Sequence, residues 1–134
     1  MKIFFDTNVL ASALATRGLC ADLFRLVVTE HELLTGEFNL SELRRVLRER
    51  FRVLPAVAKE AELALRQNTI VPVPRKTLPL EVRDPDDAWV LASAVRAGAD
   101  VLVSGDKDLL AIAEHAPIRI MDPRGLWNLL RPVR

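Results

Sequence analysis

The sequence predicts a three-layer α/β fold, in which helices flank a central parallel sheet of about four or five strands. Short apolar runs of strand length alternate along the chain with segments of helical periodicity. Strands that are joined through helical crossovers lie parallel, and the helices then cover both faces of the sheet. A length of 134 residues is typical of one domain. We therefore expect a single domain over residues 1–134.

Local composition predicts the strands, and the spacing of apolar residues predicts the helices between them. The expected strands are Ile3–Phe5, Glu32–Thr35, Thr69–Val73, Val101–Val103 and Ile118–Met121. The expected helices are one that begins at Val9, Cys20–Val28, one with Leu40, Leu43, Val46 and Leu47 on its apolar face, Ala56–Leu65, Asp84–Ala97, Lys107–Glu114 and Arg124–Leu130. Prolines keep residues Pro72–Arg83 out of helix, which predicts a loop there.

Composition narrows the class of protein. A net charge of +1 is too small for a chain that holds nucleic acid by charge alone, although fifteen Arg against four Lys provide groups for phosphate contacts. The lone Cys20 excludes an internal disulfide, and the lack of a Cys-x-x-Cys or Cys/His grouping argues against structural zinc. No uncharged apolar stretch reaches the ~18 residues of a membrane span. An acid at position 6 comes too early for a signal peptide, so we expect a soluble, cytoplasmic protein.

Acidic residues follow two of the predicted strands. In open parallel sheets, ligands bind at the carboxyl ends of the strands. Asp6 directly follows the first strand, and Asp106 and Asp108 follow the strand Val101–Val103. Each of these acids, taken singly, also fits the N-cap of the next helix. Both interpretations stay open at this stage.

Further acids lie near the starts of predicted helices. Glu42 falls in the first predicted turn of its helix, beside the apolar stripe, where it also fits a capping residue or a partner of Arg45. Capping explains Asp84 and Asp86, which lie at the start of the expected helix Asp84–Ala97. It explains Asp87 less well, because Asp87 shares the apolar stripe of that helix. A buried carboxylate needs a partner.

These acids are expected to converge on one edge of the sheet. Asp6, Asp106 and the start of the Asp87 helix meet there, and the Glu42 helix lies within reach. No Arg or Lys near Asp6 or Asp87 is an obvious counter-ion, and carboxylates gathered without cations repel one another unless a divalent metal neutralises them. Such oxygen ligands suit Mg²⁺ or Mn²⁺. Metal-assisted phosphodiester hydrolysis is the hypothesis that follows.

Four segments, in this order, resemble the PIN-domain family of metal-dependent ribonucleases, which includes the VapC-type toxins of toxin–antitoxin operons. They are Phe5-Asp6-Thr7-Asn8, Ser41-Glu42-Leu43, Asp84-Pro85-Asp86-Asp87-Ala88-Trp89-Val90-Leu91-Ala92 and Val103-Ser104-Gly105-Asp106-Lys107-Asp108-Leu109. Together they span almost the whole chain. Ala88 departs from the family pattern, in which the acidic run often continues.

The resemblance implies an activity, a site and partners. It implies an endoribonuclease that uses one or two Mg²⁺ or Mn²⁺ ions, acts on RNA and forms a homodimer. For the toxin branch it also implies inhibition by a small antitoxin protein. It assigns metal binding and catalysis to Asp6, Glu42, Asp87 and Asp106, and supporting roles to Thr7, Asn8, Ser104 and Asp108.

An arginine cluster beside Glu42 is the candidate substrate surface. The cluster consists of Arg44, Arg45, Arg48, Arg50 and Arg52, with Glu49 the only acid among them. Its candidate substrate contacts are Arg44, Arg45 and Arg48. The alternatives are a salt-bridged, solvated helix face, or a surface that docks an acidic antitoxin segment. His31 and His115 are isolated, so the chain offers no histidine acid–base pair.

Other function classes fit less well. A receiver-like phosphorylation module needs an acid pair after the first strand, and a haloacid-dehalogenase-type phosphatase needs Asp-x-Asp where this chain has Asp6-Thr7-Asn8. No Gly-x-Gly-x-x-Gly follows a strand, which disfavours a nucleotide-binding oxidoreductase. A non-catalytic PIN-like binding module and a housekeeping RNA-processing nuclease remain as alternatives.

Overall fold

The computed structural model describes residues 1–131 and contains one five-stranded, all-parallel sheet in the order β3-β2-β1-β4-β5. The strands are β1 (Lys2–Phe5), β2 (Glu32–Gly36), β3 (Thr69–Val71), β4 (Val101–Val103) and β5 (Arg119–Met121). β1 occupies the centre, with Ile3 in register with Leu33 of β2 and with Val101 of β4. The predicted fold class is confirmed.

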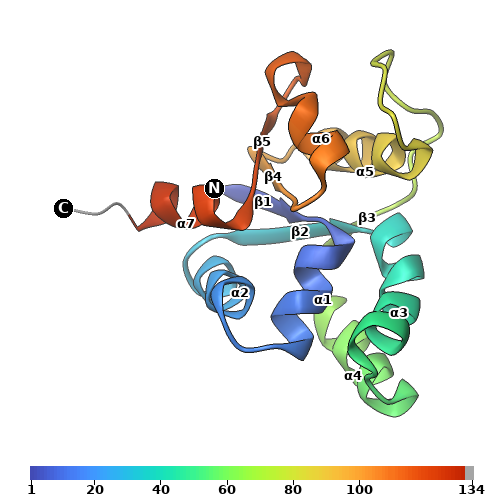
Figure 1. Cartoon of the computed structure of the whole chain (residues 1–134), viewed down its shortest axis with the longest axis vertical. Helices are drawn as coiled ribbons and strands as arrows, with labels where there is room; N and C mark the ends of the chain where they lie inside the picture. Colours follow the sequence, from blue (N-terminus) through green and yellow to red (C-terminus); the bar gives the residue numbers. More distant parts are fainter. Residues whose placement is uncertain (132–134) are drawn as a thin grey trace.

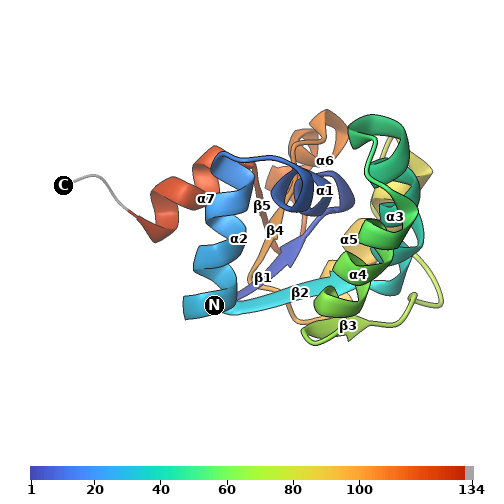
Figure 2. The same ribbon diagram turned by 90° about the horizontal axis from the view of Figure 1, so that it is seen from below.

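Helices cover both faces of this sheet, so the molecule has three layers (Figure 1). One layer holds α1 (Thr7–Ala15), α2 (Leu19–Glu30), α3 (Glu37–Phe51), α4 (Pro55–Leu65) and α7 (Pro123–Leu130). The other layer holds α5 (Pro85–Arg96) and α6 (Lys107–Ala111), and a 3₁₀ turn follows at Ala113–His115. Viewed from below, α7 lies beside α2 (Figure 2).

The central strand shows how the two cores form. Ile3 and Phe5 pack into the core beneath α1, α2 and α3, whereas Phe4 packs into the core beneath α5 and α6. All three side chains are fully buried. Successive side chains of a strand point to opposite faces, so a wholly apolar strand serves both layers.

Several element boundaries lie one to three residues from their expected positions, among them the end of β3, the end of α6 and the start of α3. β3 ends at Val71 instead of residue 73, because Pro72 has no N–H with which to continue the ladder. The helix expected over Lys107–Glu114 stops at Ala111 and gives way to the 3₁₀ turn. α3 begins at Glu37, so Glu42 lies in its second turn and not in its first.

The expected loop is confirmed, since residues 72–84 contain no helix or strand. In the described residues 1–131, no helix is long and apolar enough to cross a membrane.

Three connections that carry acidic residues lie at the carboxyl edge of the sheet: β1 to α1, the loop into α5, and β4 to α6.

Candidate metal centre

Asp6 is held rigidly where β1 ends. Its backbone N–H donates to the carbonyl of Val103 at 3.1 Å, which ties it to β4. Its carboxylate Oδ1 accepts from the Thr7 N–H at 2.7 Å, and its Oδ2 accepts from the Ser104 hydroxyl at 2.7 Å. Burial raises the pKa of Asp6, the two hydrogen bonds oppose that rise, and the charge of Asp106 adds to it. Asp6 is thus both a helix cap and a buried acid of the site.

Three other carboxylates gather at the same edge. One oxygen from each of Asp84, Asp87 and Asp106 lies within 4.8 Å of the others, the only such group of acidic, His or Cys side chains in residues 1–131. Asp84 and Asp106 are the N-caps of α5 and α6, accepting from the backbone N–H groups of Asp86 and Asp108. Capping and clustering are therefore compatible, because the caps themselves bring the acids together.

Asp87 contributes a buried side chain to this group. It is only 5% exposed, and its Oδ2 has no hydrogen-bond partner in the described chain. Burial raises the pKa of Asp87 to about 8, and the neighbouring carboxylates of Asp106, Asp84 and Asp6 add to the rise. Asp86, in contrast, is exposed. The structure thus places Asp87, as expected, on the inward side of α5.

No protein cation neutralises the group. Among residues 1–131, no Lys, Arg or His nitrogen lies within 4.0 Å of the carboxylates of Asp84, Asp87 or Asp106. A buried carboxylate without a donor or a counter-ion is costly. An all-oxygen donor set of this kind fits a hard divalent cation.

Glu42 borders the group from the second turn of α3. Its side chain is 26% exposed, and its Oε2 lies 3.6 Å from Arg45 Nη2. Burial raises the pKa of Glu42, as do the charges of Asp86, Asp6 and Asp84, while Arg45 opposes the rise. Glu42 is therefore exposed to the charge of the neighbouring acids, although it lies outside the close group of three.

Ser104 joins two of the acids. Its fully buried hydroxyl donates to Asp6 and accepts from the backbone N–H of Asp106 at 3.0 Å. Asp108 reaches the site through its backbone, since its N–H donates to Asp106 Oδ1 at 2.8 Å. The structure therefore places the Ser104 hydroxyl and the Asp108 N–H where each supports an acid.

Thr7 and Asn8 contact α3. The Thr7 hydroxyl accepts from Asn39 Nδ2 at 3.0 Å, and Asn8 Oδ1 accepts from Arg50 Nη1 at 2.9 Å. Asn39 is fully buried, and sequence reasoning missed it. A polar residue on the apolar side of α3, three positions before Glu42, was the available signal. Sequence reasoning also gave Asp84 only a capping role.

The candidate substrate arginines are largely paired with acids. Arg44 Nε lies 2.8 Å from Glu62 Oε1, and Arg45 lies between Glu42 and Glu49. Arg48 makes one ion pair, 3.6 Å to Glu49, and its side chain is 65% exposed. The salt-bridged interpretation therefore describes Arg44 and Arg45, while Arg48 remains the most accessible of the three.

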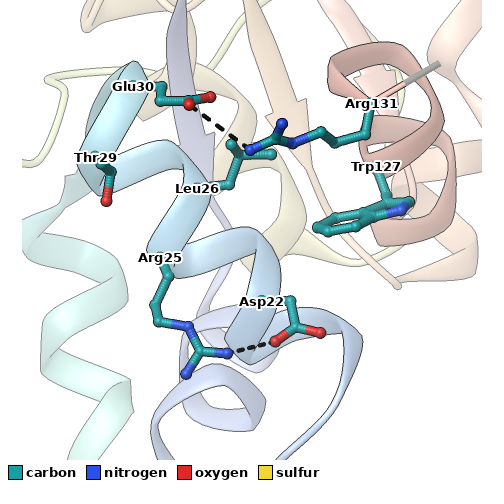
Figure 3. Close-up of a pocket in the computed structure, with 7 residues that line it drawn as sticks. All are labelled: Asp22, Arg25, Leu26, Thr29, Glu30, Trp127 and Arg131. Atoms are coloured by element: carbon teal, nitrogen blue, oxygen red, sulfur yellow. Dashed lines mark hydrogen bonds and ion pairs between the residues drawn. The ribbon is translucent and has the colours of Figure 1, made fainter.

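A cavity of about 320 Å³ between α2 and α7 differs from the acid group in how its acids are paired (Figure 3). It is lined by Asp22, Arg25, Leu26, Thr29, Glu30, Trp127 and Arg131. Asp22 pairs with Arg25, and Glu30 pairs with Arg131 at 3.6 Å. Because both of its acids have cations, this cavity does not offer the unmatched carboxylates found at the sheet edge.

A parallel sheet with buried acids at its carboxyl edge defines a class of fold and site, and comparison with known sequences gives the family. The PIN domain matches residues 2–108. The chain therefore belongs to the PIN-domain family. No curated protein sequence matches it.

Solved structures share its fold. VapBC2 from Rickettsia felis, bound to a promoter DNA fragment, superposes with a TM-score of 0.64 at 13% identity, covering 91% of this chain and 98% of that one. VapC20 from Mycobacterium tuberculosis, a toxin that cleaves the sarcin–ricin loop, gives 0.57 at 21% identity, with 81% and 93% covered. VapBC-1 from nontypeable Haemophilus influenzae gives 0.62 at 15% identity, with 92% and 99% covered.

Proposed function

We propose that the protein is an endoribonuclease that depends on one or two Mg²⁺ or Mn²⁺ ions. The observation that carries this proposal is the buried Oδ2 of Asp87, which has no hydrogen-bond partner among residues 1–131 and belongs to a carboxylate close to those of Asp84 and Asp106. Membership of the PIN-domain family supports the same activity. A purely structural cluster of acids gains nothing from this arrangement, because repulsion and burial both oppose its charge.

Four acids hold the cation in this proposal: Asp6, Glu42, Asp87 and Asp106. When bound, the cation supplies Lewis acidity that activates water and stabilises negative charge on a phosphoryl oxygen. The Ser104 hydroxyl holds the Asp6 carboxylate through a hydrogen bond and fixes the backbone of Asp106. The Glu42 side chain is partly exposed and borders the solvent.

The biological role we propose is that of a toxin in a type II toxin–antitoxin pair, controlled by a small antitoxin protein. VapBC2 and VapBC-1, which share the fold, are VapBC proteins, and VapC20, which also shares it, is a toxin. We also propose a homodimer, which would have a mass of about 30 kDa, twice the 15.0 kDa of the chain. Induced expression of the wild-type protein in a bacterial host should arrest growth, and expression of Asp87→Asn should not. Light scattering measures the mass of the particle in solution and so tests the homodimer.

Cleavage of a structured RNA pool tests the enzymatic activity. Wild type should cut with Mg²⁺ or Mn²⁺ and stop on chelation, and Asp6→Asn and Asp87→Asn should lose cleavage by at least about a hundredfold. Asn keeps the size of Asp and removes its charge. Asp100→Asn is the matched control, because Asp100 directly precedes β4, at the end of the strand away from Asp106. Its carboxylate accepts from the Lys2 N–H at 2.7 Å. Folded wild type that binds metal and leaves every RNA intact would support the non-catalytic alternative.

A further inference from the structure

Asp84 lies close to both other acids of the group, Asp87 and Asp106. It is partly buried, and one of its carboxylate oxygens is within 4.8 Å of an oxygen from Asp87 and one from Asp106. Two ligands that are each ~2.1 Å from one Mg²⁺ lie roughly 3–4 Å apart. Small side-chain rotations therefore suffice to bring all three oxygens to a single cation.

Capping of α5 leaves half of this carboxylate available. Asp84 Oδ1 accepts from the backbone N–H of Asp86 at 3.0 Å, and within residues 1–131 no other side-chain hydrogen bond reaches Asp84. The cap also fixes the direction of the side chain before any ligand arrives. A preorganised ligand loses little conformational freedom when it binds.

A second observation points to a cation at this position. Asp87 is 5% exposed and presents a buried oxygen without a donor in the described chain. The missing partner must be positive or must carry a proton. Asp84 contributes one of the two other carboxylates that have an oxygen within 4.8 Å of an Asp87 oxygen.

The start of α7 shows that an Asp-Pro cap does not by itself require acidic neighbours. Asp122 precedes Pro123 as Asp84 precedes Pro85, and Asp122 Oδ1 accepts from the Gly125 N–H at 2.7 Å. Asp122 is exposed and belongs to no group of acids among residues 1–131. The two caps share their local chemistry and differ in their surroundings.

We propose that Asp84 is an additional ligand of the divalent cation, directly or through one water, beside Asp87 and Asp106. This inference rests on the metal centre of the proposed function. It adds a ligand that comes from the loop before α5, so the cap that starts this helix also helps to close the metal site.

Calorimetric titration of the full chain with Mn²⁺, without RNA, tests this role. Asp84→Asn should weaken Mn²⁺ binding by about tenfold or more, because Asn caps a helix as well as Asp does but loses the charged ligand. Asp122→Asn is the matched control and should bind Mn²⁺ as the wild type does. The melting temperature of metal-free Asp84→Asn should equal or exceed that of the wild type, because one repelling carboxylate is gone.

The outcomes separate this inference from the proposed function. If Asp87→Asn loses Mn²⁺ and Asp84→Asn binds it with wild-type affinity, the role of Asp84 is overturned and the metal centre stands. If the wild type binds no Mn²⁺, both are overturned. Asp84→Ser keeps a capping side chain without a carboxylate and must reproduce the weaker binding. A loss confined to Asp84→Asn would refute a ligand role.

Discussion

At the level of single residues, the fold holds Asp87 where its charge is unfavourable. The side chain lies on the inward side of α5, beside two capping acids, and one of its oxygens has no donor in the described chain. Burial is the first cause of its raised pKa, and the neighbouring carboxylates add to it. In the metal-free protein, the charged form of Asp87 therefore lowers the free energy of unfolding, and a bound cation removes this penalty.

That cost makes the stability of the metal-free protein depend on pH. The pKa of Asp87 is about 8 in the folded chain and near its ordinary value of 3.8 in the unfolded chain. The folded state then binds more protons between these two values, so stability falls as the pH rises through this window. We expect the melting temperature of the metal-free wild type to drop more between about pH 5 and pH 8.5 than that of Asp87→Asn.

Circular dichroism at a series of pH values measures both slopes. Mn²⁺ at saturation should reduce the drop in the wild type, since the cation replaces the proton. Equal slopes for wild type and Asp87→Asn without metal would show that Asp87 has no raised pKa.

At the level of elements, local chemistry predicted most of the fold. The apolar strand around Phe4 predicts a buried parallel strand, and Asp84 followed by Pro85 predicts the start of α5, as the structure confirms. The expectation that Asp6, Asp87 and Asp106 lie close together follows from the rule that parallel strands end at one edge. The structure groups Asp87 with Asp106 and links Asp6 to Asp106 through Ser104.

The start of α3 was not predictable from neighbouring residues. Its N-cap is Gly36, which offers no side-chain cap, whereas Asn39 and Glu42 have the spacing of a capping box. Asn39 instead donates to Thr7, a residue 32 positions away in the chain. The contribution of Asp84 to the acid group was missed for a similar reason, because it depends on the path of the loop 72–84.

The end of β2 lies close against α5, and this close approach yields a test. A Cβ at Gly36 would lie 3.2 Å from Asn39 Oδ1 and 3.3 Å from Ser93 Cβ, and both neighbours are fully buried. Gly36→Ala should therefore destabilise the protein by about 1–3 kcal/mol, which lowers the melting temperature by several degrees. Gly105→Ala is the control, because a Cβ there meets nothing within 4 Å. A Gly36→Ala variant as stable as Gly105→Ala would show that β2 and α5 are less tightly packed than these two distances indicate.

At the level of the whole molecule, the net charge is small, but positive and negative side chains gather in different regions. The net charge is +1. Among residues 1–131, however, the carboxyl edge of the sheet gathers acids without a paired cation, while α3 carries Arg44, Arg45 and Arg48. RNA is itself an anion, so acids alone would repel it, and affinity has to come from nearby positive groups. Arg48, six residues beyond Glu42 and ~9 Å further along the helix axis, is the accessible candidate.

Arg48→Gln should therefore weaken RNA binding by about threefold to tenfold and make it less sensitive to salt by about one phosphate contact. Fluorescence anisotropy with labelled RNA measures this in an Asp87→Asn background, in which we expect binding without cleavage. Gln keeps the helix propensity of Arg and removes only the charge. Arg25→Gln is the matched control, because Arg25 pairs with Asp22 at the cavity between α2 and α7. An equal effect of the two substitutions would mean that RNA responds to the total charge and not to the α3 face.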